Sequence, residues 1–262
     1  MQRRSFLATS ALAGSASLPA VAAAQAGSAA PAILEFRYFR CRNTTDNQRA
    51  RLTDWLLRTV APACARIGAG PLGLFNASIG MDAPFILAIL SHPSMAQFEQ
   101  THAKLMADDA FRTASEAFFA GPGLPFQRME TQLLRAFKGF PSIEVPPRKD
   151  GARLFELRCY ESNTPVSLAK KIGMFESGEI DIFRKAGMLP VLFGETVVGP
   201  NMPNLTYMLA HDSLTAREAN WRAFGGSPEW KKMAATPGLS DGEVVSNIST
   251  TLLSPLAGSQ IR

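Results

Sequence analysis

The stretch "HDSLTAREANWRAFGGSPEWKKM" (residues 211–233) decides the fold, because an earlier stretch, "HPSMAQFEQTHAKLMADDAFRTA" (residues 92–114), follows the same pattern 119 positions before it. Further pairs at this offset are Gly68 with Gly187, Pro71 with Pro190, and Gly80 with Gly199. The unit starts also match, "ILEFRYF" (33–39) with "LFELRCY" (154–160), at an offset two residues longer. Agreement at so many positions indicates a duplicated unit.

Each unit predicts the same order of elements. An alternating strand opens the unit, and a helical stretch follows that ends at a glycine. Two apolar runs joined by Gly and Pro give a hairpin signal, and a helix with a capping-box pattern leads to a closing strand. The order β-α-β-β-α-β is that of the ferredoxin-like split βαβ unit. Its sheet carries helices on one face only, so the other face needs a partner, and the second copy supplies one.

We therefore predict an α+β protein in which two ferredoxin-like (βαββαβ) repeats form an α+β barrel, within one chain or between two. The first domain is expected at residues 33–138 and the second at 152–254. The Pro-rich, charged stretch "GFPSIEVPPRKDG" (139–151) reads as the linker between them.

The N-terminal stretch "MQRRSFLATSALAGSASLPAVAAAQAG" is typical of a signal peptide at residues 1–24, with an A-x-A cleavage site ending at Ala24. Arg3 and Arg4, with the Ser-Phe-Leu that follows, resemble the twin-arginine export motif. An ordinary Sec signal is the alternative. Either route places the mature chain in the periplasm or outside the cell, without a transmembrane anchor.

Composition narrows the function classes. Of 262 residues, 46% are hydrophobic and 19% charged, which is ordinary for a globular protein and argues against disorder or several membrane spans. Basic residues are interspersed with acids, so we expect no nucleic-acid partner. The three cysteines, Cys41, Cys64 and Cys159, permit one disulfide at most or serve as small buried apolar residues. No metal-binding or cofactor motif appears.

The second unit resembles the NIPSNAP family in its strand "ELRCY" (156–160), its helix "REANW" (217–221) and its "PEW" (228–230). The first unit is a divergent copy, with His102 in place of Trp221 and Phe111 in place of Trp230. The resemblance implies a dimeric α+β-barrel fold of the ferredoxin-like type. It implies no particular reaction, because the family has no widely shared mechanism.

Alternation along the opening strands places Glu156, Arg158 and Tyr160 on one face. Glu35 and Arg37 occupy the same positions in the first copy. We predict that the apolar face packs on helices and that this polar face points into the barrel. Buried charges need partners, so the polar face indicates either structural Glu–Arg pairs or a cavity for a polar or anionic molecule. The predicted pocket residues are Glu35, Arg37, Glu156, Arg158, Tyr160, Tyr207 and His211.

Two functions remain open from the sequence. The first is an exported protein that binds a small polar or anionic molecule in a barrel cavity, or acts as an interaction module. The alternative is a barrel enzyme, monooxygenase- or isomerase-like, acting on a small hydrophobic or aromatic substrate. Its acid–base groups would be among Glu156, Tyr160, Tyr207 and His211, although His92 and His211 also suit loop or capping positions. The cofactor and the catalytic residues are unassigned, and the open partners are a small-molecule ligand and a second copy in a homodimer.

Overall fold

The computed structural model describes residues 30–151 and 153–262. The predicted signal peptide (1–24) lies outside the described residues. Within them, no helix combines the length and the apolar character needed to cross a membrane. All three cysteines lie within them and are free thiols, with Cys41 and Cys64 buried.

Both repeats fold in the predicted order. The first contains β1 (Ile33–Arg40), α1 (Gln48–Trp55), the π-helical turn η1 (Leu56–Val60), α2 (Ala61–Arg66), β2 (Leu72–Ile79), β3 (Phe85–His92), α3 (Met95–Ala107), α4 (Asp109–Ala120) and β4 (Arg128–Ala136). The second contains β5 (Leu154–Glu161), α5 (Pro165–Met174), η2 (Phe175–Glu179), α6 (Ile180–Lys185), β6 (Leu189–Val198), β7 (Asn204–His211), α7 (Leu214–Gly226), α8 (Pro228–Ala234), α9 (Asp241–Val244) and β8 (Asn247–Pro255).

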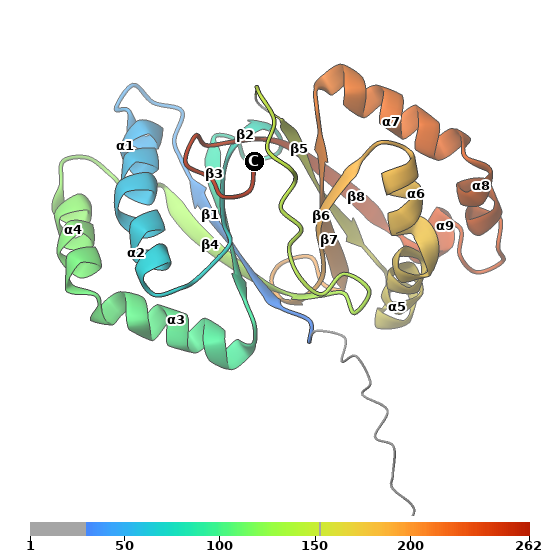
Figure 1. The fold of residues 1–262 in the computed structure, drawn as a ribbon, viewed down its shortest axis with the longest axis horizontal. Helices are drawn as coiled ribbons and strands as arrows, with labels where there is room; N and C mark the ends of the chain where they lie inside the picture. Colours follow the sequence, from blue (N-terminus) through green and yellow to red (C-terminus); the bar gives the residue numbers. More distant parts are fainter. Residues whose placement is uncertain (1–29, 152) are drawn as a thin grey trace, which may run out of the picture.

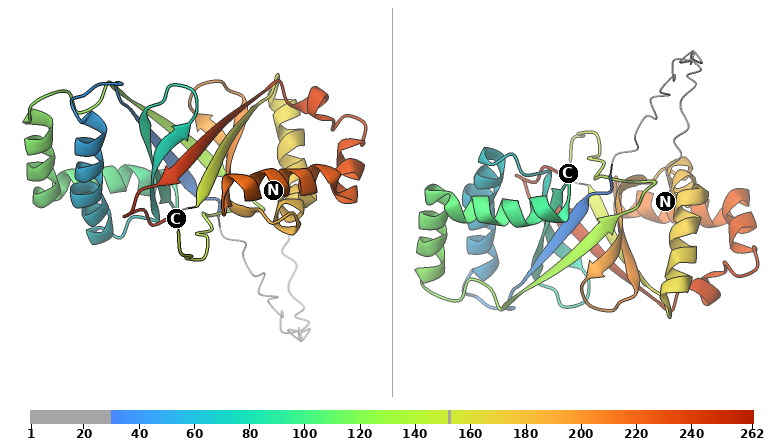
Figure 2. Two further views of the ribbon diagram at one scale, coloured as in Figure 1. Left: turned by 90° about the horizontal axis from the view of Figure 1, so that it is seen from above. Right: turned by 90° about the horizontal axis from the view of Figure 1, so that it is seen from below.

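The eight strands form one closed barrel in the order β1-β3-β2-β8-β5-β7-β6-β4. The two sheets join at the antiparallel pairs β2–β8 and β4–β6, and each of these seams contains a register shift. Helices α1–α4 cover one side of the barrel and α5–α9 the opposite side (Figures 1 and 2). The predicted α+β barrel is confirmed, and it closes within a single chain.

The barrel interior is filled by the apolar face of the strands. Leu34 and Phe36 of β1 and Phe155 and Leu157 of β5 belong to one buried cluster that also includes residues of the other strands. The prediction that the Glu/Arg face points into the barrel is therefore wrong. Closure removes the inner face from water along most of its length, where unpaired charges are costly. The alternate residues face the helices instead, whose side chains supply hydrogen-bond donors.

The C-terminal segment after β8 seals one end of the barrel. Ile261 is fully buried in the barrel cluster. The Leu74 N–H donates to Ser259 Oγ over 2.9 Å, and the Gln260 N–H donates to the Leu72 carbonyl over 3.0 Å. A Cβ atom on Gly73 would lie 2.8 Å from Cδ1 of Ile261, so glycine permits this close approach.

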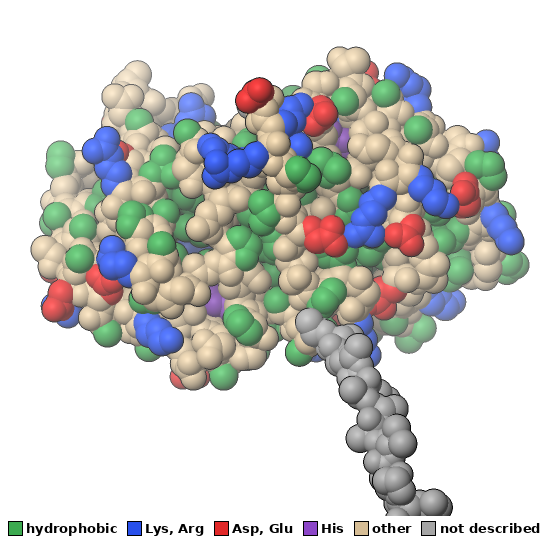
Figure 3. Space-filling view, viewed as in Figure 1, with side chains coloured by type: hydrophobic (Ala, Val, Ile, Leu, Met, Phe, Trp, Pro, Cys, Tyr) green, Lys and Arg blue, Asp and Glu red, His purple; other side chains and the backbone are tan. Residues whose placement is uncertain are grey.

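The surface shows no separation of charge on the face drawn in Figure 3. Basic and acidic side chains are interspersed there among apolar and uncharged ones. Several ion pairs between these charges are exposed, such as Arg184 with Glu144 and Lys185 with Glu229. Exposed pairs of this kind contribute little to stability, so the fold depends on the buried layers.

The seal predicts a measurable loss of stability for Ile261→Ala. Removing a fully buried isoleucine side chain should lower the free energy of unfolding by about 2–5 kcal/mol. Ile248→Ala, at a side chain that is 40% exposed, is the control and should cost about 1 kcal/mol or less. Urea denaturation of both variants measures this difference, and equal losses would show that the C-terminal segment does not contribute to the core.

Candidate functional site

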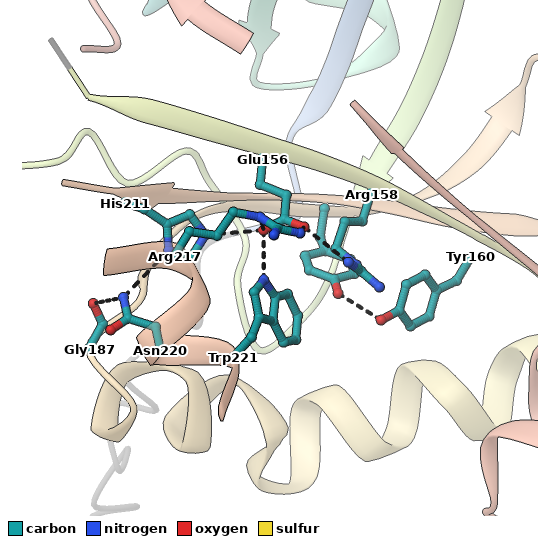
Figure 4. Close-up of polar contacts among 9 residues, drawn as sticks. Glu156, Arg158, Tyr160, Gly187, His211, Arg217, Asn220 and Trp221 are labelled. Atoms are coloured by element: carbon teal, nitrogen blue, oxygen red, sulfur yellow. Dashed lines mark hydrogen bonds and ion pairs between the residues drawn. The ribbon is translucent and has the colours of Figure 1, made fainter. Parts of the chain in front are cut away.

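Glu156 of β5 is the centre of the largest polar cluster between sheet and helices (Figure 4). The carboxylate is fully buried. Its donors are His211 Nε2 (3.2 Å), Arg217 Nε (2.9 Å) and Nη2 (2.6 Å), Trp221 Nε1 (2.8 Å) and Arg158 Nη1 (3.0 Å). Strand β7 and helix α7 therefore meet strand β5 at this single carboxylate.

These contacts keep Glu156 ionised. Burial by itself raises the pKa of Glu156, but hydrogen bonds from His211, Arg217 and Trp221 outweigh it and hold the pKa well below 4.5. A general base works best with a pKa near the operating pH. Glu156 is therefore suited to hold α7 against the sheet rather than to exchange protons.

Glu35 is the equivalent centre in the first repeat. It accepts hydrogen bonds from His92 Nε2 (3.1 Å) and His102 Nε2 (3.2 Å), and it forms an ion pair with Arg37. Burial raises the pKa of Glu35, and the contacts from His102, His92 and Arg37 together lower it well below 4.5. The predicted Glu–Arg pairing is thus present in both repeats, but His102 stands where the second repeat has Trp221.

The space next to Glu156 is filled. The Tyr207 hydroxyl donates to the Tyr160 hydroxyl over 2.9 Å, and both side chains are buried. Lys171 and Glu179 form a buried ion pair at 3.0 Å, and burial raises the pKa of Glu179 to about 7 against the opposing effect of Lys171. Burial likewise raises the pKa of Tyr207 well above 10. In the second repeat, these residues are therefore parts of a packed core.

The corresponding space in the first repeat is hollow, and six of the residues that line it are smaller than their repeat mates. Pairs at the repeat offsets are Ala88 for Tyr207, Cys64 for Phe183, Leu56 for Phe175, Phe39 for Tyr160, His102 for Trp221 and Phe111 for Trp230. All six first-repeat residues line one cavity of about 60 Å³ between the sheet and the helices. Part of the volume that side chains occupy in the second repeat is therefore open in the first.

This inner cavity adjoins a larger one of about 320 Å³. The two share Arg37, Phe39, Trp55 and Phe111. The outer cavity is further lined by Phe119, Phe126 and Met129 from α4, the following loop and β4. We call the two together the first-repeat hollow. It has an aromatic outer part and a polar inner corner at Glu35 and His102.

Arg37 lines the hollow and contains one buried nitrogen without a partner in the described part of the chain. Among the described residues, its buried Nε has no hydrogen-bond partner. Among the same residues, Arg158 Nε of the second repeat also lacks a hydrogen-bond partner. The guanidinium carbon of Arg158 lies over the Trp221 ring, 4.7 Å from the ring centroid. The two arginines differ in their surroundings: Arg37 lines both cavities of the hollow, whereas the guanidinium of Arg158 lies over the rings of Tyr160 and Trp221.

The predicted site residues thus divide between two places. Glu35 and Arg37 line the hollow. The other five belong to the filled second repeat: Glu156, Arg158, Tyr160, Tyr207 and His211. The prediction missed Trp55, Ala88 and His102 as lining residues. A size comparison of repeat mates, above all Ala88 with Tyr207, is the sequence signal that identifies them.

Within residues 30–151 and 153–262, no group of three or more His, Cys, Asp or Glu side chains is arranged to hold a metal ion. His102 pairs with the carboxylate of Glu35. The lining of the hollow combines hydrogen-bonding groups with aromatic surface.

Comparison with known proteins identifies related sequences and folds. The NIPSNAP family profile matches the chain twice, at residues 34–139 and 155–260. None of the curated proteins matches this sequence. A proposed monooxygenase from Fusobacterium nucleatum is 11% identical with a TM-score of 0.59, covering 87% of this chain and 93% of its own. A proposed monooxygenase from Lactobacillus acidophilus is 13% identical with a TM-score of 0.57, covering 86% and 94%. At these identities the likeness shows the barrel fold alone.

The Glu156 cluster predicts a pH-dependent cost for Glu156→Gln. At pH 7 the variant should lose about 3–5 kcal/mol of unfolding free energy, because buried arginine donors lose their charged partner. The pKa of Glu156 is lower in the folded chain than in the unfolded one. Its ionised form therefore stabilises the fold fully above about pH 5, and that contribution declines as the pH falls below about 4.5.

Urea denaturation of wild type and Glu156→Gln at pH 7 and pH 4 measures this effect. The difference between the two proteins should be smaller at pH 4. Glu218→Gln on the exposed side of α7 is the matched control and should behave as wild type. An undiminished difference at pH 4 would contradict the role assigned to the ionised carboxylate.

Proposed function

This chain belongs to the NIPSNAP family, and we propose that its first repeat binds one small, largely aromatic molecule in the hollow between the sheet and α1–α4. The observation that supports this is the asymmetry of the repeats. Six positions that are large in the filled second repeat are smaller in the first and line one open volume. Unfilled core volume destabilises a protein, so a retained hollow favours a ligand role.

The lining indicates the chemistry of the ligand. Trp55, Phe39, Phe111, Phe119 and Phe126 present aromatic surface, and aromatic groups pack on one another with favourable geometry. The Trp55 ring is stacked on Phe118 at 5.1 Å, which holds its orientation. A planar ring system of roughly ten non-hydrogen atoms suits a pocket of this kind.

The polar corner accepts one oxygen atom of the ligand. Arg37 lines both cavities of the hollow, and its charge is already balanced by Glu35. A phenol or carbonyl oxygen therefore fits better than a second anion, because it adds no net charge to a partly buried site. The proposed ligand differs from the polar or anionic molecule expected inside the barrel: it is uncharged and would lie between the sheet and the helices.

A second candidate function uses the same hollow as an active site. Two proteins of this fold are described as proposed monooxygenases. His102 lies in the hollow and contacts Glu35 at 3.2 Å, an arrangement in which a carboxylate orients an imidazole for proton transfer. An enzyme acting on a small aromatic substrate, with His102 as the acid–base residue, is the alternative that turnover assays with hydroxylated aromatics would test.

Export and pairing of chains complete the proposal. The signal peptide at residues 1–24 would send the mature chain to the periplasm or outside the cell. Since the barrel closes within one chain, a homodimer would form through its outer surfaces. Light scattering on the mature chain distinguishes monomer from dimer.

The hollow predicts selective binding of 2-naphthol, a bicyclic phenol. His102→Trp places the side chain of Trp221 in the hollow, and Ala88→Phe places there a ring similar to that of Tyr207. Each should weaken binding about tenfold or more, a loss of at least about 1.4 kcal/mol. The replacements should be tolerated because the sister repeat packs Trp221 and Tyr207 at these positions. Ligand-observed NMR titration measures the affinity.

Ala103→Trp is the matched control, because it adds the same side chain on the exposed face of α3. It should bind 2-naphthol as wild type does. Naphthalene should bind more weakly than 2-naphthol if Arg37 holds the oxygen. Unchanged binding in His102→Trp and Ala88→Phe would refute the hollow as the binding site.

A further inference from the structure

The barrel has a second open space, at the end opposite the C-terminal seal. A cavity of about 1030 Å³ lies there. It is bordered by the β2–β3 connection (residues 80–84) and the β6–β7 connection (residues 199–203). Its lining includes Tyr38 of β1, Leu157 and Cys159 of β5, and residues of the other strands. We call this space the barrel mouth; it shares no lining residue with the first-repeat hollow.

The interior of the barrel changes from apolar to polar at the mouth. Strands β4 and β8 both show this change. It falls in "TQLL" (131–134) and "TTLL" (250–253), which occupy equivalent positions in the two repeats. Leu134 and Leu253 belong to the apolar cluster, whereas Gln132 and Thr251, two residues nearer the mouth on the same face, line the cavity. Strand β7 shows the same change: Met208 belongs to the apolar cluster, and Thr206, two residues nearer the mouth, lines the cavity.

The need to pack the barrel interior does not explain this change from apolar to polar side chains. The β3 residue at the repeat position of Thr206 is Leu87, which is fully buried in the barrel cluster. A leucine therefore fits inside the barrel at this level of the first sheet. A few hydrogen-bonding side chains beside apolar surface, around an open volume of about this size, are features of small-molecule sites.

The charged groups of the mouth already have partners. Arg40 donates to Glu130 from Nε (3.2 Å) and Nη2 (2.9 Å), and Arg128 also pairs with Glu130. Glu161 accepts hydrogen bonds from Asn247 (2.9 Å) and Asn201 (3.3 Å). A charged ligand would compete with these contacts, whereas an uncharged one can use the remaining hydroxyl and amide groups.

The mouth also has apolar surface at two levels. Inside, Tyr38 and Phe85 form an edge-to-face pair with ring centroids 5.5 Å apart, and the guanidinium of Arg40 lies over both rings. At the rim, Met81 is 81% exposed and Val198 is 56% exposed. A bound molecule can therefore meet apolar side chains both inside the mouth and along its rim.

We propose that the barrel mouth is a second binding site, which takes an uncharged, hydroxyl-rich amphiphile with a sugar-sized ring and a short aliphatic tail. Hydroxyl groups of the ring would meet Gln132, Thr206 and Thr251, and its apolar face would meet Tyr38. The volume of the mouth is at the upper end of small-molecule pockets. Both repeats contribute, so the site exists only in the closed barrel.

The test uses octyl β-D-glucoside below its micelle concentration, with octanoate and octylammonium as probes of equal tail length and opposite charge. Calorimetric titration of the mature chain should show saturable binding of the glucoside that is at least about tenfold tighter than binding of either charged probe. The double substitution Thr206→Leu with Thr251→Leu extends the apolar core by one layer and should weaken glucoside binding about tenfold or more. His102→Trp, which fills only the hollow, should leave it unchanged.

A second measurement needs no variant. Cys159 lines the mouth, while Cys41 and Cys64 are buried elsewhere. Saturating octyl glucoside should slow alkylation of Cys159 by iodoacetamide, read by peptide mass spectrometry, whereas octylammonium at the same concentration should not. Absence of saturable glucoside binding, tighter binding of a charged probe, or loss of binding in His102→Trp would each overturn the proposal.

Discussion

Closure of the strands into one barrel is the constraint on which the rest of the structure depends. A closed barrel has no edge strands, and its inner face is removed from water wherever side chains fill it. Charged residues on the strands can then lie only on the helix side or at an open end. Glu35 and Glu156 lie on the helix side, and Arg40 and Glu161 lie at the open end of the barrel. Both polar regions of the molecule follow from this division.

The two repeats keep one feature and differ in the volume around it. Each has a buried carboxylate on its opening strand that receives donors from the last residue of its third strand and from the following helix. Around Glu156 the remaining space is packed with aromatic rings, and around Glu35 it is open. A fully packed sister repeat can contribute the stability that a hollow one lacks, because the barrel core joins them into one unit.

The sequence was sufficient for the repeat and the element order, and it offered the pairing of Glu35 with Arg37 as one of two alternatives. It gave the wrong direction for the polar face, because alternation shows which residues share a face but not which face meets the barrel interior. The hollow requires knowledge that Ala88, Cys64 and His102 converge in space. The mouth was missed because Thr and Gln near strand ends read equally well as solvent-exposed residues. In both cases the missing information is tertiary contact between segments far apart in the sequence.

The two open spaces differ in how the repeats form them. The hollow coincides with smaller residues at six positions of the first repeat, and the second repeat shows the corresponding region in a filled state. The mouth has no filled counterpart, because its wall combines β1 and β4 of one repeat with β5, β7 and β8 of the other. A change at Ala88 therefore alters one repeat alone, whereas a change at Thr206 or Thr251 alters a space that both share. Ligand specificity at the two places can consequently vary independently, even though a single barrel core supports both.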